Sequence, residues 1–320
     1  MRKKVYIDGQ EGTTGLKIIE RFNNRDDIEI LRIDEDKRKD LAQRKKLINS
    51  SDYTFLCLPD VASIEAVSLV ENENVKIIDA STAHRTNPEW AYGFPELSKE
   101  HREKIAQSKR VAVPGCYASG FVSLAYPLVK ASIISKDAAI TSHALSGYSG
   151  GGKKMIAQYT GDNFKEEYLS PRQYALTQQH KHQKEMQIIS GLDFKPMFNP
   201  IVANYFCGMV VSIPLITRTL AKKVSPQEIC SVLKQHYAGE HFVKVMDFMG
   251  EGVLQDGFIA ANTLANKNDM QLFVFGNDEQ ILLCSRLDNL SKGASGAAVQ
   301  CMNIMMGIDE KTGLEEEICL

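Results

Sequence analysis

A cysteine placed just before an apolar segment is the residue of this chain best suited to covalent chemistry. Cys116 follows the short run Val111–Val113 and the break Pro114-Gly115, and the apolar run Phe121–Val129 comes after it. This order indicates a buried strand, a turn and a helix that begins at the cysteine. Unpartnered backbone N–H groups and the helix dipole favour a thiolate there. The pattern therefore predicts covalent acyl transfer, with a small buried cysteine as the alternative.

Two histidines later in the chain are the expected acid–base partners of that thiol. His180 and His182 lie after Tyr174–Thr177, which we interpret as a strand leading into a helix. No acidic or cysteine cluster is near them, so a metal site is disfavoured and acid–base work is preferred, with His180 as first choice. The other histidines are expected to be ordinary core or surface residues: His84, His101, His143, His236 and His241.

A glycine-rich turn near the start of the chain predicts a dinucleotide site. Gly9, Gly12 and Gly15 follow the expected strand Lys4–Ile7 and open an expected helix over Gly15–Asn23. Glycines allow a tight turn, and a pyrophosphate can then approach the helix N-terminus. The spacing differs from the commonest fingerprint, so a plain glycine-rich turn is the alternative.

The end of the next strand normally selects between NAD and NADP, and here it carries both signals. Asp34 could bind a ribose 2′-hydroxyl, whereas Arg32, Lys37 and Arg38 could bind a 2′-phosphate. A solvated run of charges is a further alternative, so the residues leave the choice open.

Two other polar loops are candidates for binding anionic parts of a ligand. Arg85 follows the strand Val75–Asp79, at the sheet edge where open α/β domains bind ligands, and it could instead pair with Asp79 or Glu89 at the surface. The glycine loop Ser146–Lys154 could surround an anion with backbone N–H groups, or it could be a flexible surface loop.

The elements that must position these residues change character along the chain. Short apolar strands alternate with helical segments in the first third, which predicts a doubly wound parallel α/β domain. The expected strands are Lys4–Ile7, Ile28–Ile33, Tyr53–Leu58, Val75–Asp79 and Val111–Val113. The expected helices are Gly15–Asn23, Asp40–Ile48 and Val61–Glu71, the last capped by Asp60.

Longer, more alternating strands follow Cys116 and predict an α+β second domain with an antiparallel or mixed sheet. These strands are Ala139–Leu145, Gly208–Arg218, Gln271–Phe275 and Gln280–Leu287. The last two flank a hairpin signal at Gly276-Asn277-Asp278, and Ser225-Pro226-Gln227-Glu228 announces a helix with a capping box. The small-residue segment Ser291–Gln300 leads into a final helix through about Met306.

The composition is that of an ordinary globular protein. The 320 residues are 43% hydrophobic and 24% charged, and the formal net charge is −2. These values favour two domains and give no reason to expect nucleic acid or a membrane as partner. The seven scattered cysteines include no Cys-x-x-Cys pair, so neither disulfides nor zinc are expected. With no signal-peptide pattern at the N-terminus, we expect a soluble cytoplasmic protein.

Taken together, these motifs resemble the shorter branch of the N-acetyl-γ-glutamyl-phosphate reductases over nearly the whole chain. More distantly, the chain resembles aspartate-semialdehyde dehydrogenases and phosphorylating glyceraldehyde-3-phosphate dehydrogenases. The segments that carry the resemblance are Asp8–Leu16, Leu56–Asp60, Ile78–Arg85, Tyr92–Leu97, Val113–Gly120, the Ser146 loop, His180–His182 and Lys292–Gln300.

The resemblance implies a Rossmann-type dinucleotide domain over residues 1–115 with 290–320, and a catalytic and dimerisation domain over 116–289. It implies NADPH-dependent reduction of N-acetyl-γ-glutamyl phosphate to N-acetylglutamate 5-semialdehyde and phosphate, a step of arginine biosynthesis, through a thioester on Cys116. His180 or His182 would supply the acid–base group, and the chain would form a homodimer or homotetramer.

The resemblance also implies further site residues. The residues for NADP(H) would be Gly9, Gly12, Thr13, Thr14, Gly15, Arg32, Arg38, Leu58, Pro59, Ser81, Gly293, Ala294, Ser295 and Gly296. The residues for the substrate would be Arg85, Ser119, Ser146, Gly147 and Lys153. One departure is that family members often have proline at the position of Lys184, so a helix-start signal is missing after the histidines.

Two other functions compete with this interpretation. Another acyl-phosphate reductase, such as an aspartate-semialdehyde or lysine-pathway enzyme, would share the chemistry and differ in the substrate tail. A dinucleotide sensor without catalysis would need no thiol at a helix start. Rapid alkylation of one cysteine near neutral pH would favour an enzyme over a sensor.

Overall fold

The computed structural model describes residues 2–162 and 164–315, and these residues divide into two compact units. The first unit contains the residues up to Gly115 and those from Ala294 on, and the second contains Cys116–Gly293. The second boundary, expected between residues 289 and 290, therefore falls four residues later, between 293 and 294.

The first unit is built on a parallel sheet of short buried strands. Within the described residues its six strands are β1 (Lys3–Asp8), β2 (Ile28–Leu31), β3 (Tyr53–Leu56), β4 (Lys76–Asp79), β5 (Ala91–Tyr92) and β6 (Arg110–Ala112). They lie in the order β2-β1-β3-β4-β6-β5, and every neighbouring pair is parallel. The doubly wound α/β prediction is confirmed. The two-residue strand β5 was not predicted, because so short a segment has no periodicity.

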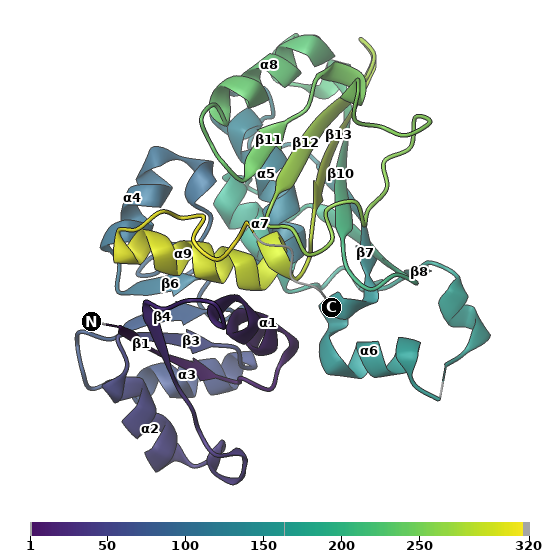
Figure 1. Ribbon diagram of the computed structural model, residues 1–320. Helices are drawn as coiled ribbons and strands as arrows, with labels where there is room; N and C mark the ends of the chain where they lie inside the picture. Colours follow the sequence, from purple (N-terminus) through teal and green to yellow (C-terminus); the bar gives the residue numbers. More distant parts are fainter. Residues whose placement is uncertain (1, 163, 316–320) are drawn as a thin grey trace. The chain divides into compact units, whose positions relative to one another are not determined.

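Helices cover both faces of this sheet (Figure 1). The helices are α1 (Thr13–Phe22), α2 (Leu41–Ser50), α3 (Asp60–Ser68), α4 (Lys99–Gln107) and α9 (Gly296–Met306), with short 3₁₀ turns at Glu35–Lys37 and Pro95–Leu97. Helix α9 packs against α1, α4 and β4, while α2 and α3 lie on the other side of the sheet. Tyr6, Leu56, Ile77 and Trp90 belong to the core of this unit. The last helix thus completes the domain that the first 115 residues begin.

One predicted cap in this unit is wrong. Pro59, not Asp60, precedes α3, and Asp60 is its first helical residue. The carboxylate of Asp60 accepts hydrogen bonds from the backbone N–H of Thr82 at 2.9 Å and from its hydroxyl at 2.5 Å. Asp60 therefore ties the loop after β4 to the start of α3, a contact that no local pattern reveals.

The second unit contains a mixed sheet. Within the described residues its strands are β7 (Thr141–Gly147), β8 (Arg172–Gln173), β9 (Met197–Ala203), β10 (Met209–Ile216), β11 (Val243–Val245), β12 (Met270–Gly276) and β13 (Gln280–Leu287). Their order is β11-β12-β13-β10-β7-β9-β8. Two neighbouring pairs, β7 with β9 and β11 with β12, are parallel and the others are antiparallel. The α+β prediction and the β12–β13 hairpin are confirmed.

Helices cover one face of the mixed sheet. The helices of this unit are α5 (Cys116–Lys130), α6 (Gly152–Thr160), α7 (His182–Ser190) and α8 (Pro226–His236). Short 3₁₀ turns occur at Tyr148–Gly151, Glu166–Leu169, Thr217–Thr219 and Phe248–Gly250, and Ser291–Ser295 forms a π-helical turn. Helix α5 packs on β10 and β13 and contacts α7 and α8. The capping box predicted at Ser225 and Glu228 is present.

The prediction of a strand at Tyr174–Thr177 is wrong. Strand β8 ends at Gln173, and Ala175 and Gln178 have φ angles of 54° and 55°, in the left-handed region. Residues other than glycine rarely take this conformation, because their Cβ crowds the backbone. The segment between β8 and α7 is therefore not extended, and its path sets where the histidines lie. In the described part of the chain, no helix combines the length and apolar character that spanning a membrane would need.

Candidate active site

Cys116 is the first residue of α5, at the helix start that the sequence predicted. It is half-buried, and the turn 288–293 packs against it. Asp288, fully buried, holds that turn: one carboxylate oxygen accepts from the backbone N–H groups of Leu290 and Ser291, at 2.6 and 2.7 Å. Its carbonyl oxygen accepts from the N–H of Gly293 at 2.8 Å. The thiol-bearing residue is thus flanked by a turn with a defined shape.

A cavity of about 230 Å³ in the second unit brings the thiol and both histidines together. The residues that line it come from α5, the Ser146 loop and the segment before α7. They are Cys116, Tyr117, Ser146, Gly147, Gly150, Gly151, Met155, Tyr174, His180, Lys181, His182 and Val202. Such a cavity has room for a small acyl group between a nucleophile and two imidazoles.

The two imidazoles have different surroundings within this cavity. The ring centroids of His180 and His182 are 4.7 Å apart, and the rings are nearly perpendicular. His180 packs edge-on against Phe198 at 5.1 Å and against Tyr117 at 6.0 Å. The backbone N–H of His182 donates to Nδ1 of His180 at 3.1 Å. One ring nitrogen of His180 is therefore a hydrogen-bond acceptor.

Two tyrosines that the sequence analysis did not select also line the cavity. The hydroxyl of Tyr174 donates to the hydroxyl of Tyr117 at 2.9 Å. Burial raises the pKa of Tyr117 well above its usual value, and burial raises the pKa of Tyr174 to about 12. Both phenols therefore stay protonated at neutral pH and act as neutral hydrogen-bond donors. Their signal in the sequence is weak, although Tyr117 adjoins the cysteine.

The Ser146 loop forms another wall of the cavity. A side chain at Gly147 would meet the carbonyl oxygen of Phe206 at 2.5 Å, so the close approach of these two backbone segments requires glycine. Asn289 holds the loop in place, since its Nδ2 donates to Ser149 Oγ at 2.9 Å and its Oδ1 accepts from the N–H of Gly208 at 2.8 Å.

Two expected substrate residues lie elsewhere in this unit. Ser119 is 2% exposed on α5, and Lys153 is exposed on α6. Neither is among the described residues that line the cavity.

The other cysteines differ from Cys116 in their surroundings. Cys207, Cys230, Cys284 and Cys301 are buried, and Cys319 lies outside the described residues. Burial raises the pKa of Cys57 and of Cys230, and it raises the pKa of Cys284 to about 11. The thiols of Cys57, Cys230 and Cys284 therefore stay protonated near neutral pH and are poor nucleophiles.

The first unit contains its own cavity, of about 530 Å³, at the carboxyl ends of β1 to β3. Its lining combines the glycine turn with apolar side chains and side chains of both charges: Asp8, Gly9, Gln10, Glu11, Ile33, Arg38, Lys39, Leu41, Arg44, Leu58, Ala62 and Glu65. This edge of an open parallel sheet is where such folds bind dinucleotides.

The glycine turn fits a dinucleotide. A side chain at Gly9, where φ is 91°, would meet the carbonyl oxygen of Cys57 at 2.3 Å, and one at Gly15 would meet the carbonyl oxygen of Gly9 at 2.6 Å. Gly12 occupies the N-cap of α1, and no described side chain caps this helix. The N–H groups of Thr13 and Thr14 at its first turn can therefore face a pyrophosphate.

The charges after β2 are distributed unequally around this cavity. The side chain of Asp34 is 70% exposed and pairs with Lys37 at 2.9 Å. Arg38 lines the cavity together with Lys39, which the sequence analysis did not select, whereas Arg32 is exposed and is not among its described lining residues. Cations rather than the carboxylate of Asp34 thus border the site.

A buried ion-pair network also borders this cavity. Arg44 donates to Asp8 Oδ2 through Nε and Nη2, at 3.0 and 2.9 Å, and to Glu65 through Nη1 at 2.8 Å. Burial raises the pKa of Asp8 in spite of this pairing. Sequence reasoning missed Arg44 and Glu65, since they lie on α2 and α3 and meet Asp8 only when the sheet forms.

The loop after β4 is held by its own polar side chains. Arg85 donates through Nε to the carbonyl oxygen of Val113 at 2.8 Å and through Nη2 to that of Ala80 at 3.1 Å. Asp79 accepts from Ser81 and from His84 Nδ1. His84 also stacks on Trp90. Two donors of Arg85 are thus bound to backbone carbonyls, which ties the loop after β4 to the residue that follows β6.

The remaining cofactor positions of the sequence analysis are distributed as follows. Leu58 lines the cavity of the first unit, and Pro59 precedes α3. Ser295 and Gly296 are buried in the first unit at the start of α9, next to Ala294, while Gly293 belongs to the second unit.

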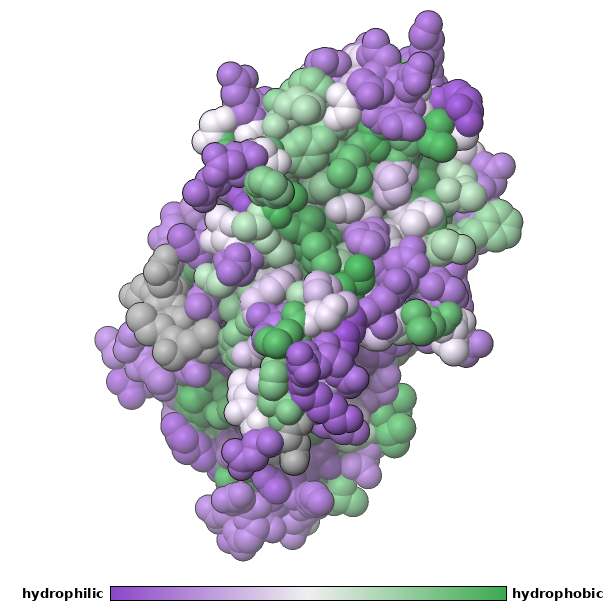
Figure 2. All heavy atoms as spheres, turned by 90° about the vertical axis from the view of Figure 1, so that its right-hand side faces the viewer, coloured by the Kyte–Doolittle hydropathy of each residue, from purple (hydrophilic) through white to green (hydrophobic). Residues whose placement is uncertain are grey.

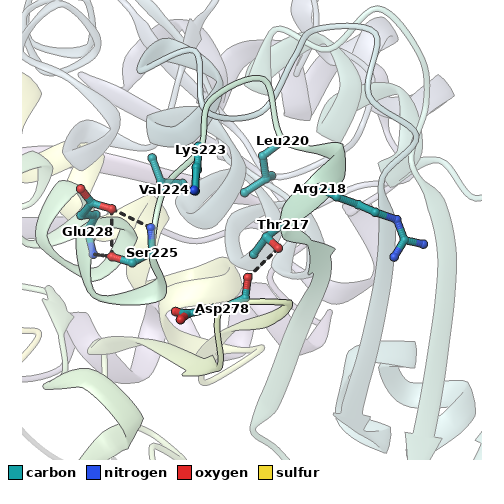
Figure 3. Close-up of a pocket in the computed structure, with 8 residues that line it drawn as sticks. All are labelled: Thr217, Arg218, Leu220, Lys223, Val224, Ser225, Glu228 and Asp278. Atoms are coloured by element: carbon teal, nitrogen blue, oxygen red, sulfur yellow. Dashed lines mark hydrogen bonds between the residues drawn. The ribbon is translucent and has the colours of Figure 1, made fainter.

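A third cavity, of about 750 Å³, lies beyond the end of β10 in the second unit (Figure 3). Its charged lining residues are Arg218, Lys223, Glu228 and Asp278. The carboxylate of Glu228 accepts from the backbone and hydroxyl of Ser225, and Thr217 Oγ1 donates to the carbonyl oxygen of Asp278 at 2.7 Å. The carboxylate of Glu228 and the hydroxyl of Thr217 are thus used in a helix cap and in a turn.

Comparison with known proteins agrees with both units. Residues 4–107 match the family model "Semialdehyde dehydrogenase, NAD binding domain", and residues 116–289 match "Semialdehyde dehydrogenase, dimerisation domain". Among solved structures, aspartate semialdehyde dehydrogenase II of Vibrio cholerae superposes with a TM-score of 0.69 and 14% identity, covering 96% of this chain and 99% of its own. The enzyme of Francisella tularensis gives 0.70 and 15%, covering 96% and 100%. At this identity the likeness concerns the fold alone.

Closer relatives share nearly the whole sequence. The N-acetyl-gamma-glutamyl-phosphate reductase 2 of Nostoc sp. is 49% identical over 98% of this chain and 99% of its own. The N-acetyl-gamma-glutamyl-phosphate reductase of Brucella ovis is 45% identical over 96% of this chain and 100% of its own. With two semialdehyde dehydrogenase domains and relatives of this similarity, the chain belongs to the N-acetyl-gamma-glutamyl-phosphate reductase family.

Proposed function

We propose that this protein reduces N-acetyl-γ-glutamyl phosphate to N-acetylglutamate 5-semialdehyde and phosphate with NADPH, as a step of arginine biosynthesis. The observation that carries the proposal is the single cavity that Cys116 shares with His180 and His182. A binding protein has no need for a half-buried cysteine at a helix start beside two imidazoles. The names of the 45–49% identical relatives support the choice of substrate.

Cys116 is the nucleophile of the proposed reaction. The start of α5 favours its thiolate, and the thiolate attacks the acyl carbon while phosphate leaves, so a thioester forms on Sγ. His180 and His182 line the same cavity, and one imidazole takes the proton of the thiol while the other is a hydrogen-bond donor to the acyl group. After reduction of the acyl group, the C–S bond breaks, and the aldehyde leaves as the thiolate returns.

The cofactor is proposed to bind to the first unit. Gly9 and Gly15 allow the tight turn, and the start of α1 accepts the pyrophosphate. Arg38 and Lys39 line the cavity and would bind a 2′-phosphate, so we propose NADP(H) rather than NAD(H). When bound, the nicotinamide supplies the hydride for the acyl group on Cys116.

The second unit offers fewer substrate-binding residues than the sequence suggested. Ser146 and Gly147 line the cavity and are proposed to contact the substrate, together with the Tyr117 and Tyr174 hydroxyls. We leave Ser119 and Lys153 out because neither lines the cavity, and Arg85 because two of its donors bind backbone carbonyls.

The uncovered face of the mixed sheet is proposed to pair with a second copy of the chain. Along β7 the side chains alternate, with His143 and Leu145 exposed and their neighbours buried or half-buried. Leu145, Met197, Ile216 and Leu282 are between 37% and 58% exposed, and apolar side chains are visible on the side of the molecule in Figure 2. The dimerisation-domain match over residues 116–289 supports this use of the face.

Sedimentation of a charged variant tests the pairing. Leu145→Glu places a carboxylate on this face, and we expect it to shift the particle toward a monomer. An unchanged sedimentation coefficient in Leu145→Glu and in Leu282→Glu would argue for another interface.

The cytoplasm is the proposed compartment, which suits a chain whose described cysteines form no disulfide.

One assay tests the reaction directly. In the reverse direction, N-acetylglutamate semialdehyde with phosphate should reduce NADP⁺, and omission of phosphate should abolish the signal. Aspartate semialdehyde in the same assay tests the runner-up function, and NAD⁺ tests the cofactor. Greater activity with aspartate semialdehyde would overturn the proposed substrate, and absence of turnover with every aldehyde would favour a sensor.

A further inference from the structure

The turn that carries the two histidines is held by hydrogen bonds that resemble a helix capping box. The N–H of His182 donates to Nδ1 of His180 at 3.1 Å, and the N–H of His180 donates to Oε1 of Gln183 at 2.8 Å. In a capping box, a Ser or Thr hydroxyl accepts at the first residue and a Glu or Gln three residues later accepts in return. Here an imidazole nitrogen takes the place of the hydroxyl, at the turn that opens α7.

Gln183 is anchored on its other side as well. It is 3% exposed, and its Nε2 donates to the carbonyl oxygen of Pro196 at 3.0 Å. Gln178 pairs with the backbone of Phe198 in both directions, since Oε1 accepts from its N–H at 2.9 Å and Nε2 donates to its carbonyl oxygen at 2.8 Å. The two glutamines thus fasten the histidine turn to the start of β9.

This arrangement replaces the helix-start signal that the sequence lacks. Lys184, at the position where family members often have proline, is exposed. Gln183 satisfies the N–H of His180, and its own N–H donates to the carbonyl oxygen of His180 at 3.0 Å. The turn is therefore defined without proline, by the side chain and backbone of Gln183.

The contact at Nδ1 decides where the proton of a neutral His180 resides. A nitrogen that accepts a hydrogen bond carries no proton, so the proton of the neutral ring is on Nε2. Protonation of Nδ1 would break the contact with His182 and place a positive charge at the start of α7, which the helix dipole disfavours. The neutral imidazole with Nε2–H is the form that the turn selects.

We infer that Gln183 is a positioning residue that holds His180 as the Nε2–H tautomer, a neutral hydrogen-bond donor to the acyl oxygen on Cys116. The inference rests on the proposed function. When the thiolate attacks, the S–C bond forms and the carbonyl electron pair moves to oxygen, where Nε2–H stabilises it. The pair then returns as the C–O bond to phosphate breaks, and phosphate leaves with the bonding electrons. The proton stays on Nε2 throughout.

Nuclear magnetic resonance of the full-length protein tests the tautomer without any assay of activity. With ¹⁵N-labelled histidine, seven side chains are observed, and the His180→Ser spectrum assigns the signal of interest. We expect a protonated Nε2 and an unprotonated Nδ1 for His180 at neutral pH. A protonated Nδ1, or an average of both tautomers, would overturn the inference even if the proposed reaction were established.

Substitutions of Gln183 test its positioning role. Gln183→Leu removes the hydrogen bonds of this side chain to His180, Pro196 and Gln178, and we expect kcat to fall roughly ten- to hundredfold with a nearly unchanged KM, together with loss of the single tautomer. Gln183→Glu keeps an acceptor for the N–H of His180 and should recover the tautomer and most of kcat. Gln187→Leu is the matched control, because Gln187 lies one turn later on α7 and its Nε2 donates to the carbonyl oxygen of Asp193, away from the histidine turn.

His180→Ser separates the cap from the chemistry if Gln183→Leu does not fold. Serine restores an ordinary capping box with Gln183, so we expect a melting temperature near that of the wild type and above that of His180→Ala. Loss of the donor should lower kcat by about 10²- to 10³-fold. Wild-type kcat in His180→Ser, or in a folded Gln183→Leu, would overturn the assignment, whereas an inactive wild-type protein would overturn the proposed function instead.

Discussion

A Cβ atom placed on Gly293 would lie 2.6 Å from the Cβ of Cys116, and 3.2 Å from its Cα. The first distance is shorter than real Cβ contacts and the second is tight, so the turn 288–293 reaches the nucleophile only because residue 293 has no side chain. The glycine thereby lets this turn, which the Asp288 carboxylate holds through two backbone N–H groups, lie directly beside the thiol.

Gly293→Ala should therefore damage the site more than it damages the fold. Overpacking of this kind costs about 1–3 kcal/mol, and relief of the clash must displace either the turn or Cys116. We expect a large loss of kcat and slower alkylation of Cys116 in a protein that still folds, as measured by circular dichroism and mass spectrometry. Gly239→Ala is the control: no atom lies within 4 Å of a Cβ there, and the φ of 86° makes alanine cost stability away from the site, so kcat should stay at the wild-type value.

Cys116→Ser should keep the fold and cofactor binding and lose nearly all turnover, because a serine hydroxyl is a far weaker nucleophile than a thiolate. In the wild type, one equivalent of iodoacetamide near neutral pH should modify Cys116 first, as the buried thiols with raised pKa react slowly. Peptide mapping checks the site of modification. Near-normal turnover in the serine variant would exclude Cys116 as nucleophile.

The double substitution Arg38→Gln with Lys39→Gln should weaken the binding of NADP⁺ more than the binding of NAD⁺. Both cations line the cavity of the first unit, and a 2′-phosphate would lose its charge partners there. We expect KM for NADP⁺ to rise about tenfold or more with little change for NAD⁺, by analogy with the loss of roughly 1.5–3 kcal/mol for a charged hydrogen bond. Arg32→Gln, at an exposed position outside the lining, should leave both values unchanged. Equal effects on the two cofactors would contradict the proposed preference.

Alkaline stability should report on the tyrosine pair. Burial raises the pKa of Tyr174 to about 12, whereas an unfolded tyrosine ionises near pH 10, about the ordinary value. Ionisation therefore favours the unfolded chain as pH rises through this window, so the stability present below pH 10 is lost progressively toward pH 12. Urea midpoints at a series of pH values should fall less steeply in Tyr174→Phe. An identical slope in both proteins would show that the pair does not control this loss.

The prediction of the fold from sequence worked where the signals are local. Apolar runs, turn residues and the Ser225 capping box specify most strands and helices of both units, because each signal lies within a few residues of its effect. Failures occurred where distant residues decide. Asp60 binds Thr82 instead of capping α3, and left-handed Ala175 ends the expected strand before the histidines.

By itself, the sequence determined that Cys116 begins a helix after a buried strand, since periodicity and the Pro-Gly break are properties of neighbouring residues. Only the tertiary structure decided which groups surround that thiol, which cations border the cofactor cavity, and that Gln183 fastens the turn of His180. The physical reason is that these contacts join segments tens of residues apart, and sheet order and packing, which no local pattern encodes, bring them within hydrogen-bond distance.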